Sequence, residues 1–467
     1  MPRAYALPES LELTPQAEDP QDGLPYPRRW WAMATVGLAI FLTVTDQTMV
    51  NVALPSMGAE MGIDPSQSVW IVNAYQLAIM LPLLPLASAG EIVGYKRIYS
   101  IGLALFTLAS LGCALSSSLP LLTFMRVVQG LGAAGVMSVN MALVRHIHPI
   151  HRLGYGIGVN AVIIAVSAAI GPAIASAILA VLPWPWLFAV KVPIGIASVV
   201  IGQWAMPETA RASHKFDAVS AILSALTFGM LIAFIDGLAH LGTPWLAAGE
   251  LAATCVAGFV LCRREMRMAS PLLPVDLLRI PMFALSVGAS MCAFMAQTLS
   301  FIAVPFHLAA MGYSAAETGL LMTPLPLATA LIAAFSGRLS DRYPAGLLGL
   351  IGLVLFAMGL ISLALLPAHP IAIDVAWRMA LAGAGFGFYQ SPNNRAIQAA
   401  APRSRSGGAS GMQAMARLLG QTVGAGLTAL VFAQFLDGAQ AAIWLAAVFS
   451  LLGAFVSASR LKDFSHP

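Results

Sequence analysis

Two residues of opposite charge, Asp46 and Arg126, lie inside long apolar segments of the chain, where charged side chains are rare. A charge at bilayer depth is costly and normally faces a partner or a water-filled cavity. Asp46 is about four residues from the end of segment 30–50, and Arg126 about seven from the start of 119–143. At 1.5 Å per residue both lie roughly 6–11 Å below the same surface. An ion pair or a shared water network between them is therefore predicted.

The two residues are suited to proton transfer, because burial and a movable guanidinium act on a carboxyl pKa in opposite directions. A carboxyl that meets these two influences in different conformations can bind a proton in one and release it in the other. We therefore expect Asp46 to exchange protons and Arg126 to tune that exchange. A static structural pair is the alternative.

Three further basic residues lie within apolar segments. Lys191 is near the end of its segment in WPWLFAVKVP, and its long side chain is expected to snorkel to the surface. Arg378 follows Asp374 by four residues, so the two can pair along one helix face, with a structural role and a substrate-binding role both open. Arg417 is expected to be structural.

The composition identifies a polytopic membrane protein. The chain has 467 residues, of which 59% are hydrophobic and 9% are charged, against about 25% charged in a soluble domain. The formal net charge is +4, but the basic residues lie in short loops, so membrane topology explains them and nucleic acid is not an expected partner. The four cysteines lie in or at the ends of apolar segments, and no disulfide is predicted.

Fourteen segments are apolar enough to cross a bilayer, which takes about 20 helical residues. They are 30–50, 69–89, 98–115, 119–143, 155–182, 185–206, 218–239, 245–262, 282–308, 315–336, 345–366, 371–397, 408–435 and 440–458. The other 20 of the 24 Lys and Arg residues all fit on one side of these spans. Basic residues concentrate in cytoplasmic loops, so both termini are predicted to be cytoplasmic and the membrane to be the inner, plasma membrane.

Polar and aromatic residues within the spans are candidates for a substrate cavity. Aromatic faces attract cations, and methionines adapt to varied ligands, so such walls would suit promiscuous apolar cations. Helix–helix packing is the alternative for any single residue. The candidates, together with Arg378, are Asn73, Tyr75, Gln76, Gln129, Gln297, Phe301, Tyr389 and Asn393.

Several motifs carry a family resemblance. TDQTMVNVALP in the first span resembles the Asp-containing motif of drug:proton antiporters in the major facilitator superfamily. Similar likenesses to that superfamily cover about residues 28–460 and are LTFMRVVQGLGAAG (122–135), SAAIGPAIAS (167–176), GRLSDRY (337–343) and GFGFYQSPNNRAIQAAAPRSRSGGASGM (385–412). The resemblance to the fourteen-span branch implies proton-coupled export of amphipathic or cationic drugs, with Asp46 exchanging a proton for substrate.

Residues in these motifs are predicted to form gates. Gly171 and Pro172 permit close helix approach or a bend. Charges at the cytoplasmic ends of two spans can form weak, breakable contacts that close the inner side. These gating candidates are Glu91, Gly94, Lys96, Gly337, Asp341 and Arg342. The sequence departs from the family pattern at Glu91, where Asp is usual, and at Lys191, where Asn is usual.

The two loop motifs follow spans 2 and 10, an offset of eight spans rather than the six expected of two equal halves. Spans 7 and 8 are thus predicted to be an inserted pair, and repeats of this kind place the substrate near the midplane between halves. The predicted organisation is therefore a tail, a six-helix bundle, a two-helix linker, a second six-helix bundle and a tail, at 1–27, 28–210, 211–267, 268–460 and 461–467.

No P-loop occurs, so an ion gradient, without a cofactor, is expected to drive transport. The histidine-rich loop HIHPIHR (146–152) is predicted to be solvated rather than a metal site. The alternatives are transport of a metabolite or organic anion through Lys191 and Arg378, a polytopic enzyme, and a transport-dead sensor. The expected partners are a small-molecule substrate, protons and the lipid bilayer, and a monomer is plausible.

Overall fold

The computed structural model describes residues 23–209, 211, 216–239, 244–268, 271–402 and 405–461. Most of the predicted terminal tails, 1–27 and 461–467, lies outside these residues, as do Lys215, Arg403 and Lys462. The short segment before the first helix is packed, however. Leu24 is buried, and its backbone N–H donates to the Ile147 carbonyl at 3.0 Å.

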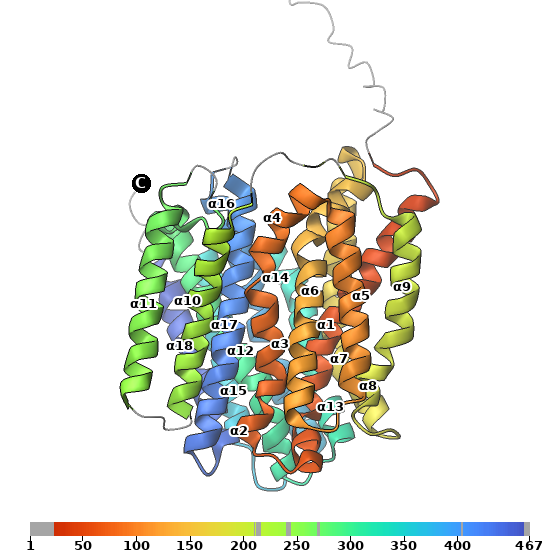
Figure 1. Cartoon of the computed structure of the whole chain (residues 1–467). Coiled ribbons are helices and arrows are strands. Elements are labelled where there is room, and N and C mark those ends of the chain that lie inside the picture. The colour runs from red at the N-terminus through yellow and green to blue at the C-terminus, as the bar shows by residue number, and fades with distance from the viewer. Residues whose placement is uncertain are drawn as a thin grey trace, which may run out of the picture.

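The described chain is helical, and its long helices run side by side (Figure 1). The N-terminal elements are α1 (Arg28–Met61), α2 (Pro65–Ser68), α3 (Trp70–Met80), α4 (Leu83–Val93), α5 (Tyr95–Ala114), α6 (Leu119–Ile147), η1 (Ile150–Arg152), α7 (Leu153–Leu179), α8 (Trp186–Ala189) and α9 (Lys191–Ala205). A peripheral pair follows, consisting of α10 (Ala218–Ala239) and α11 (Pro244–Glu265). The C-terminal elements are η2 (Val275–Arg279), α12 (Pro281–Ala310), α13 (Ala315–Met322), α14 (Pro324–Leu339), α15 (Ala345–Ala364), α16 (Ala372–Ala400), α17 (Ser406–Gln434) and α18 (Gly438–Ser459).

Twelve helices in the described residues are long and apolar enough to cross a membrane. A thirteenth span results if Pro65–Met80 and Leu83–Val93, which are bent by 42°, count as one. The break falls at Pro82, which has no backbone N–H to continue the helix. The predicted count of fourteen is not reached. The segment 371–397 forms the long helix α16, but its polar residues Gln390, Asn393 and Asn394 make it less apolar than the other spans.

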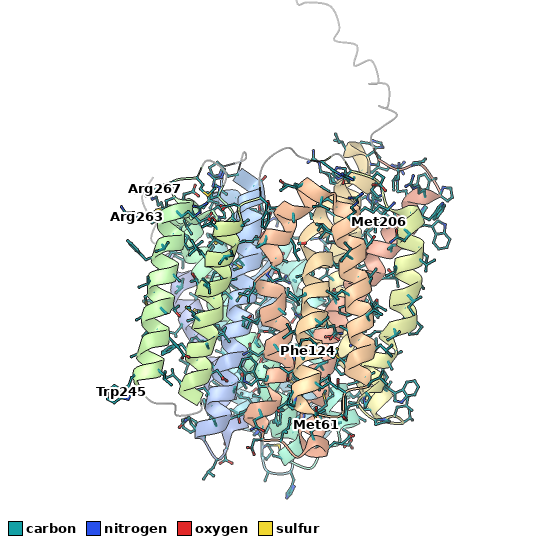
Figure 2. The ribbon with its side chains drawn as sticks, viewed as in Figure 1. Met61, Phe124, Met206, Trp245, Arg263 and Arg267 are labelled. Atoms are coloured by element: carbon teal, nitrogen blue, oxygen red, sulfur yellow. The ribbon has the colours of Figure 1, made fainter. Side chains whose placement is uncertain are left out.

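The outer surface of these helices is apolar. On α11, Val256 and Phe259 are each 64% exposed, which suits contact with lipid tails rather than water. Figure 2 shows Trp245 at one end of α11 and Arg263 and Arg267 at the other. Aromatic and basic residues commonly mark the two boundaries of a membrane helix. The fold is that of a multi-pass membrane protein.

Two groups of helices pack mainly among themselves, which we call the first group (α1 to α9) and the second group (α12 to α18). Glycines allow the closest approaches. A Cβ at Gly102 of α5 would lie 2.8 Å from the Gly132 carbonyl of α6, and one at Gly352 of α15 would lie 2.6 Å from the Tyr389 nitrogen of α16. The groups meet where α7 packs on α13 and α14, α1 on α12, and α3 on α17. The pair α10 and α11 joins the rest chiefly through α10 and α17.

Candidate functional site

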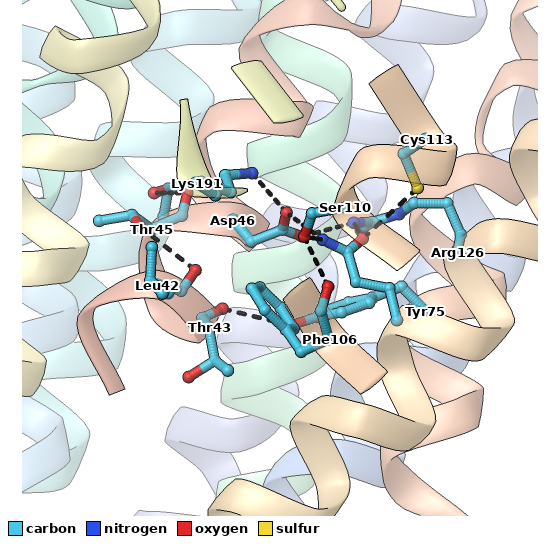
Figure 3. Close-up of polar contacts among 12 residues, drawn as sticks. Leu42, Thr43, Thr45, Asp46, Tyr75, Phe106, Ser110, Cys113, Arg126 and Lys191 are labelled. Atoms are coloured by element: carbon cyan, nitrogen blue, oxygen red, sulfur yellow. Dashed lines mark hydrogen bonds and ion pairs between the residues drawn. The ribbon is translucent and has the colours of Figure 1, made fainter. Parts of the chain in front are cut away.

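The Asp46 carboxylate lies at the centre of a buried polar cluster (Figure 3). Arg126 Nη1 donates to Asp46 Oδ2 at 2.5 Å, and Lys191 Nζ donates to Oδ1 at 2.5 Å. Gln129 Nε2 donates to Oδ1 at 3.1 Å and to Ser110 Oγ at 2.9 Å. The carboxylate is therefore saturated by three donors from α6 and α9. The predicted contact between Asp46 and Arg126 is present as a direct ion pair.

Arg126 is held from several helices. Its Nε donates to the Ile71 carbonyl of α3 at 2.9 Å, and its Nη1 also donates to Gln129 Oε1, one helical turn along α6, at 2.6 Å. The guanidinium lies 4.1 Å from the centroid of the Tyr75 ring, where a cation is attracted to the π face. Its Nη2 has no hydrogen-bond partner. Side chains and backbone thus hold Arg126 in place, and only its Nη2 amino group has no partner.

Lys191 does not snorkel, and the sequence-based expectation for it is wrong. Its side chain is only 2% exposed and reaches inward from the start of α9 to Asp46, passing 4.9 Å from the Phe188 ring centroid. The buried Asp46 carboxylate gives the ammonium an anionic partner inside the protein. The cluster of Asp46, Arg126 and Lys191 accordingly carries a net charge of +1. One feature of the sequence could have indicated the Lys191–Asp46 contact: related sequences usually have asparagine at the position of Lys191.

A cavity of about 400 Å³ lies between the two helix groups. It is lined from α1, α3, α6 and α7 on one side and from α12, α14, α16 and α17 on the other. Three of the predicted cavity residues, Gln76, Gln297 and Phe301, line it. Asp46 does not, although Gln47 beside it does. The charged cluster therefore lies behind the α1 wall of the cavity.

The other predicted cavity residues lie elsewhere. Tyr75 and Gln129 belong to the Asp46 cluster, and Asn73 is buried in α3. Arg378 pairs with Asp374 at 3.0 Å, one turn earlier on the same helix, and also donates to the Ser362 carbonyl. None of these four residues lines this cavity.

Tyr389 and Asn393 of α16 were also predicted in the cavity but pack away from it. Tyr389 is 1% exposed and lies against Phe386. Asn393 donates to the Ser286 carbonyl at 3.1 Å and accepts from Arg460 Nη1 at 2.8 Å. Arg460, which follows the last predicted span, is fully buried. These contacts join α12, α16 and the end of α18.

Arg417 was expected to be structural, but it lines the cavity from α17. Among the described residues no hydrogen bond or ion pair engages its guanidinium. The sequence held a partial signal, since Arg417 had no acidic neighbour at helical spacing. Which way α17 turns that side chain is visible only in three dimensions.

The predicted gate residues Lys96 and Asp341 lie at or next to helix ends, and each forms an ion pair. Lys96 pairs with the exposed Glu208 at 2.9 Å, and this ammonium holds the pKa of the Glu208 carboxyl below its usual range. Asp341 pairs with Arg395 of α16, whereas Arg342 is exposed. Each of these two pairs lies within one helix group.

Two glycines sit near these pairs. Gly94 has φ +107°, a conformation that side chains rarely allow, and separates α4 from α5, one turn after Glu91. A Cβ at Gly337 of α14 would lie 2.9 Å from Ser391 Oγ of α16. Both glycines therefore serve turns or close packing at the helix ends.

Gly171 and Pro172 lie where α7 meets two neighbours. A Cβ at Gly171 would overlap Thr48 Oγ1 of α1. On the other face, a Cβ at Gly319 of α13 would lie 2.7 Å from the Pro172 carbonyl oxygen. One turn on, Ser176 Oγ donates to the Ala316 carbonyl. The pair therefore lies at a close contact between the first and second groups.

The histidine-rich loop is less solvated than predicted. His148 is 5% exposed and its ring lies 6.4 Å from that of Tyr155. Within the residues that the structure covers, no three His, Cys, Asp or Glu side chains cluster as metal ligands would. Cys113, Cys255, Cys262 and Cys292 are free thiols.

The sequence matches the model of the Major Facilitator Superfamily over residues 36–425 and 286–463. It is also 49% identical to the uncharacterized transporter YebQ of Escherichia coli, over 95% of this chain and 98% of that one. The chain belongs to the Major Facilitator Superfamily. It is therefore a multi-pass membrane transporter. Members of this superfamily are transporters, so the alternative of a polytopic enzyme is not supported.

More distant members of the superfamily have different named substrates. The riboflavin transporter RibZ of Clostridioides difficile is 27% identical over 88% of this chain and 89% of its own. The multidrug resistance protein Stp of Mycobacterium tuberculosis is 28% identical over 87% and 76%. Among solved structures, an inward-facing bacterial homolog of the lysosomal transporter Spinster has a TM-score of 0.68 at 18% identity, covering 94% of this chain and 99% of that one.

Proposed function

We propose that this superfamily member is a proton-coupled antiporter that exports amphipathic organic molecules across the inner membrane. The observation that supports it best is the buried Asp46, paired with both Arg126 and Lys191 directly behind the wall of the central cavity. Proton coupling needs a titratable group next to the substrate site whose partners can change. The Asp46 cluster supports the proposal because it places a carboxyl group behind the cavity wall, with partners from two other helices.

In the proposed cycle, a proton that arrives at Asp46 neutralises the carboxylate and releases the two cations that it holds. Arg126 and Lys191 belong to α6 and α9, so their release loosens α1 from both helices. The cavity residues Thr43 and Gln47 flank Asp46 on α1. Any movement of α1 therefore changes the shape of the cavity, which links proton binding to substrate release.

The surrounding architecture is proposed to follow the fourteen-span arrangement. Residues 28–210 and 268–460 form two six-helix bundles, residues 211–267 form a two-helix linker, α16 counts as a span, and both termini are cytoplasmic. Alternating access then rocks one bundle against the other. The contact between α7 and α13 opens and closes one side of the cavity. The charged helix ends that carry Lys96 and Asp341 open and close its other side.

Export of cationic drugs is a second candidate for substrate class. It is favoured by the likeness to Stp and by the three phenylalanines on the cavity wall, Phe294, Phe301 and Phe386, whose faces can hold a cation. The RibZ likeness points instead to a metabolite. A substrate panel that contains both cationic dyes and metabolites separates these two classes.

The test of coupling is proton release on substrate addition to the purified protein, followed by efflux from proteoliposomes under a pH gradient. Wild-type protein is expected to release protons with a transported dye, and Asp46→Asn is expected to bind without release and to lose gradient-driven flux. Glu60→Gln, which makes the same carboxylate-to-amide change at an exposed position near the end of α1, serves as the matched control with unchanged flux. Full coupled transport by Asp46→Asn would overturn the proposal.

A further inference from the structure

The charge of the central cavity does not suit a cationic substrate. Of the described residues that line it, Arg417 alone carries a charge, and none is Asp or Glu. The nearest carboxylate behind the wall, Asp46, is fully buried, and both of its oxygens are already bound by cations. A cation in the cavity would face a guanidinium and no free anion.

Arg417 differs from the other arginines within the spans because it has no anionic partner. Arg126 is paired with Asp46, and Arg378 with Asp374. The guanidinium of Arg417 has five N–H donors and stays charged at any physiological pH. An unpaired charge inside a membrane span is costly, and its retention marks a role in ligand binding or transport. The missing partner of Arg417 is most simply a ligand.

Several amide side chains line the cavity, and some of their polar atoms have no hydrogen-bond partner. The buried side-chain oxygens of Asn51, Gln76 and Gln421 have no hydrogen-bond partner. Gln421 follows Arg417 by one turn on α17, so both reach the cavity from the same helix face. Buried polar groups are normally satisfied, so these oxygens can accept from an N–H or O–H group of a ligand, while the N–H groups of the same amides can donate to its acceptors.

The remaining wall is aromatic. Phe294, Phe301 and Phe386 line the cavity, and the rings of Phe294 and Phe386 meet edge to face at 5.5 Å between centroids. Such a wall stacks well on a flat apolar body. The volume of about 400 Å³ falls within the range of small-molecule sites.

We propose that Arg417 anchors the substrate and that the substrate is an amphipathic organic acid with one carboxylate on a planar apolar body. The guanidinium fork matches a carboxylate with two parallel hydrogen bonds, the neighbouring amides complete its polar surroundings, and the phenylalanines hold the ring system. This inference rests on the proposed function, since it takes the cavity as the transport site. It replaces cationic drugs with organic anions and places the anion at Arg417 rather than at Lys191 or Arg378.

The test is equilibrium binding to the purified full chain in detergent, which needs no proton gradient. The probes are aromatic carboxylates of one to three rings, each with its uncharged amide and its aminomethyl cation of the same shape. Wild-type protein is expected to bind at least one carboxylate about tenfold or more tighter than its amide, as a charged hydrogen bond implies. Arg417→Gln should remove that difference, and Arg417→Lys should keep part of it.

Arg378→Lys, which keeps its pair with Asp374, is the matched control and should bind as the wild type does. Gel filtration of each variant shows whether it is folded. If Arg417→Gln is not folded, the binding preference of Arg417→Lys decides the test. The inference is overturned if the cations bind most tightly, if no carboxylate is preferred over its amide, or if the folded variants keep the wild-type preference. Carboxylate binding without any proton-coupled flux would instead overturn the proposed function and leave this inference standing.

Discussion

Lys191 Nζ lies 2.5 Å from Asp46 Oδ1, although 145 residues separate the two in the chain. The contact makes Asp46 the shared counter-ion of two cations, because Arg126 occupies its other oxygen. The three buried side chains thus bring two cationic groups to one carboxylate. The stability of this cluster is therefore expected to depend strongly on which of its three members is removed.

Asp46→Asn is expected to destabilise the protein, since it leaves Arg126 and Lys191 buried without a counter-ion. Breaking a buried pair in this way typically costs about 3–5 kcal/mol. Lys191→Asn should change stability little, because Asp46 keeps Arg126 and Gln129. The double variant should recover only part of the loss of Asp46→Asn, because Lys191 no longer needs a counter-ion while Arg126 still lacks one. Thermal unfolding of all four proteins in detergent measures this cycle, and a double variant no more stable than Asp46→Asn would contradict it.

Glu208 contributes stability that depends on pH. Its pKa is lowered by the hydrogen bond and charge of Lys96, so the contribution is present above the ordinary glutamate value of 4.5 and is lost as the pH falls through the lowered pKa. Glu208→Gln should lower the melting temperature slightly at pH 7 and have a smaller effect at an acidic pH below 4.5. The effect stays small because Glu208 is exposed. An equal difference from the wild type at both pH values would show that the ion pair is not the cause.

Gly319→Ala is expected to separate α13 from α7. The new methyl group would lie 2.7 Å from the Pro172 carbonyl oxygen and 2.9 Å from Ser176 Cβ, which is closer than packing allows. The resulting opening should increase labelling of a single cysteine introduced at Ser176, measured in membranes in a background without the native cysteines. Gly158→Ala on α7, where nothing lies within 4 Å, is the control and should leave labelling unchanged. Unaltered labelling in Gly319→Ala would argue against a tight contact here.

Asn393→Leu is expected to lower stability by about 1–3 kcal/mol, because it removes two buried hydrogen bonds, one to the Ser286 carbonyl and one from Arg460, and leaves Arg460 with only two serine hydroxyls as partners. Ser459→Ala should have little effect, since Ser459 bonds only the Val456 carbonyl of its own helix. Thermal unfolding in detergent compares the two. Equal melting temperatures for Asn393→Leu and wild type would show that Arg460 finds other partners.

Much of the fold and part of the site could be predicted from sequence. Apolar segments separated by basic loops predict membrane helices directly, because the bilayer requires long apolar runs. Asp46 and Arg126 stand out for the same reason, and their depths were estimated from helix rise alone. The predicted count of fourteen spans exceeds the observed count in part because of α16, where polar residues reduce the apolar signal.

The direction in which each side chain points was decided only by the tertiary structure. Tyr75 and Gln76 are neighbours in sequence, yet one lies under Arg126 and the other lines the cavity, since successive helical residues differ by about 100° around the axis. Likewise, the sequence alone determined that Lys191 and Arg417 are charges within membrane spans. Only the packing of α9 on α1 and the rotation of α17 decided that Lys191 is paired with Asp46 and that Arg417 faces an open cavity.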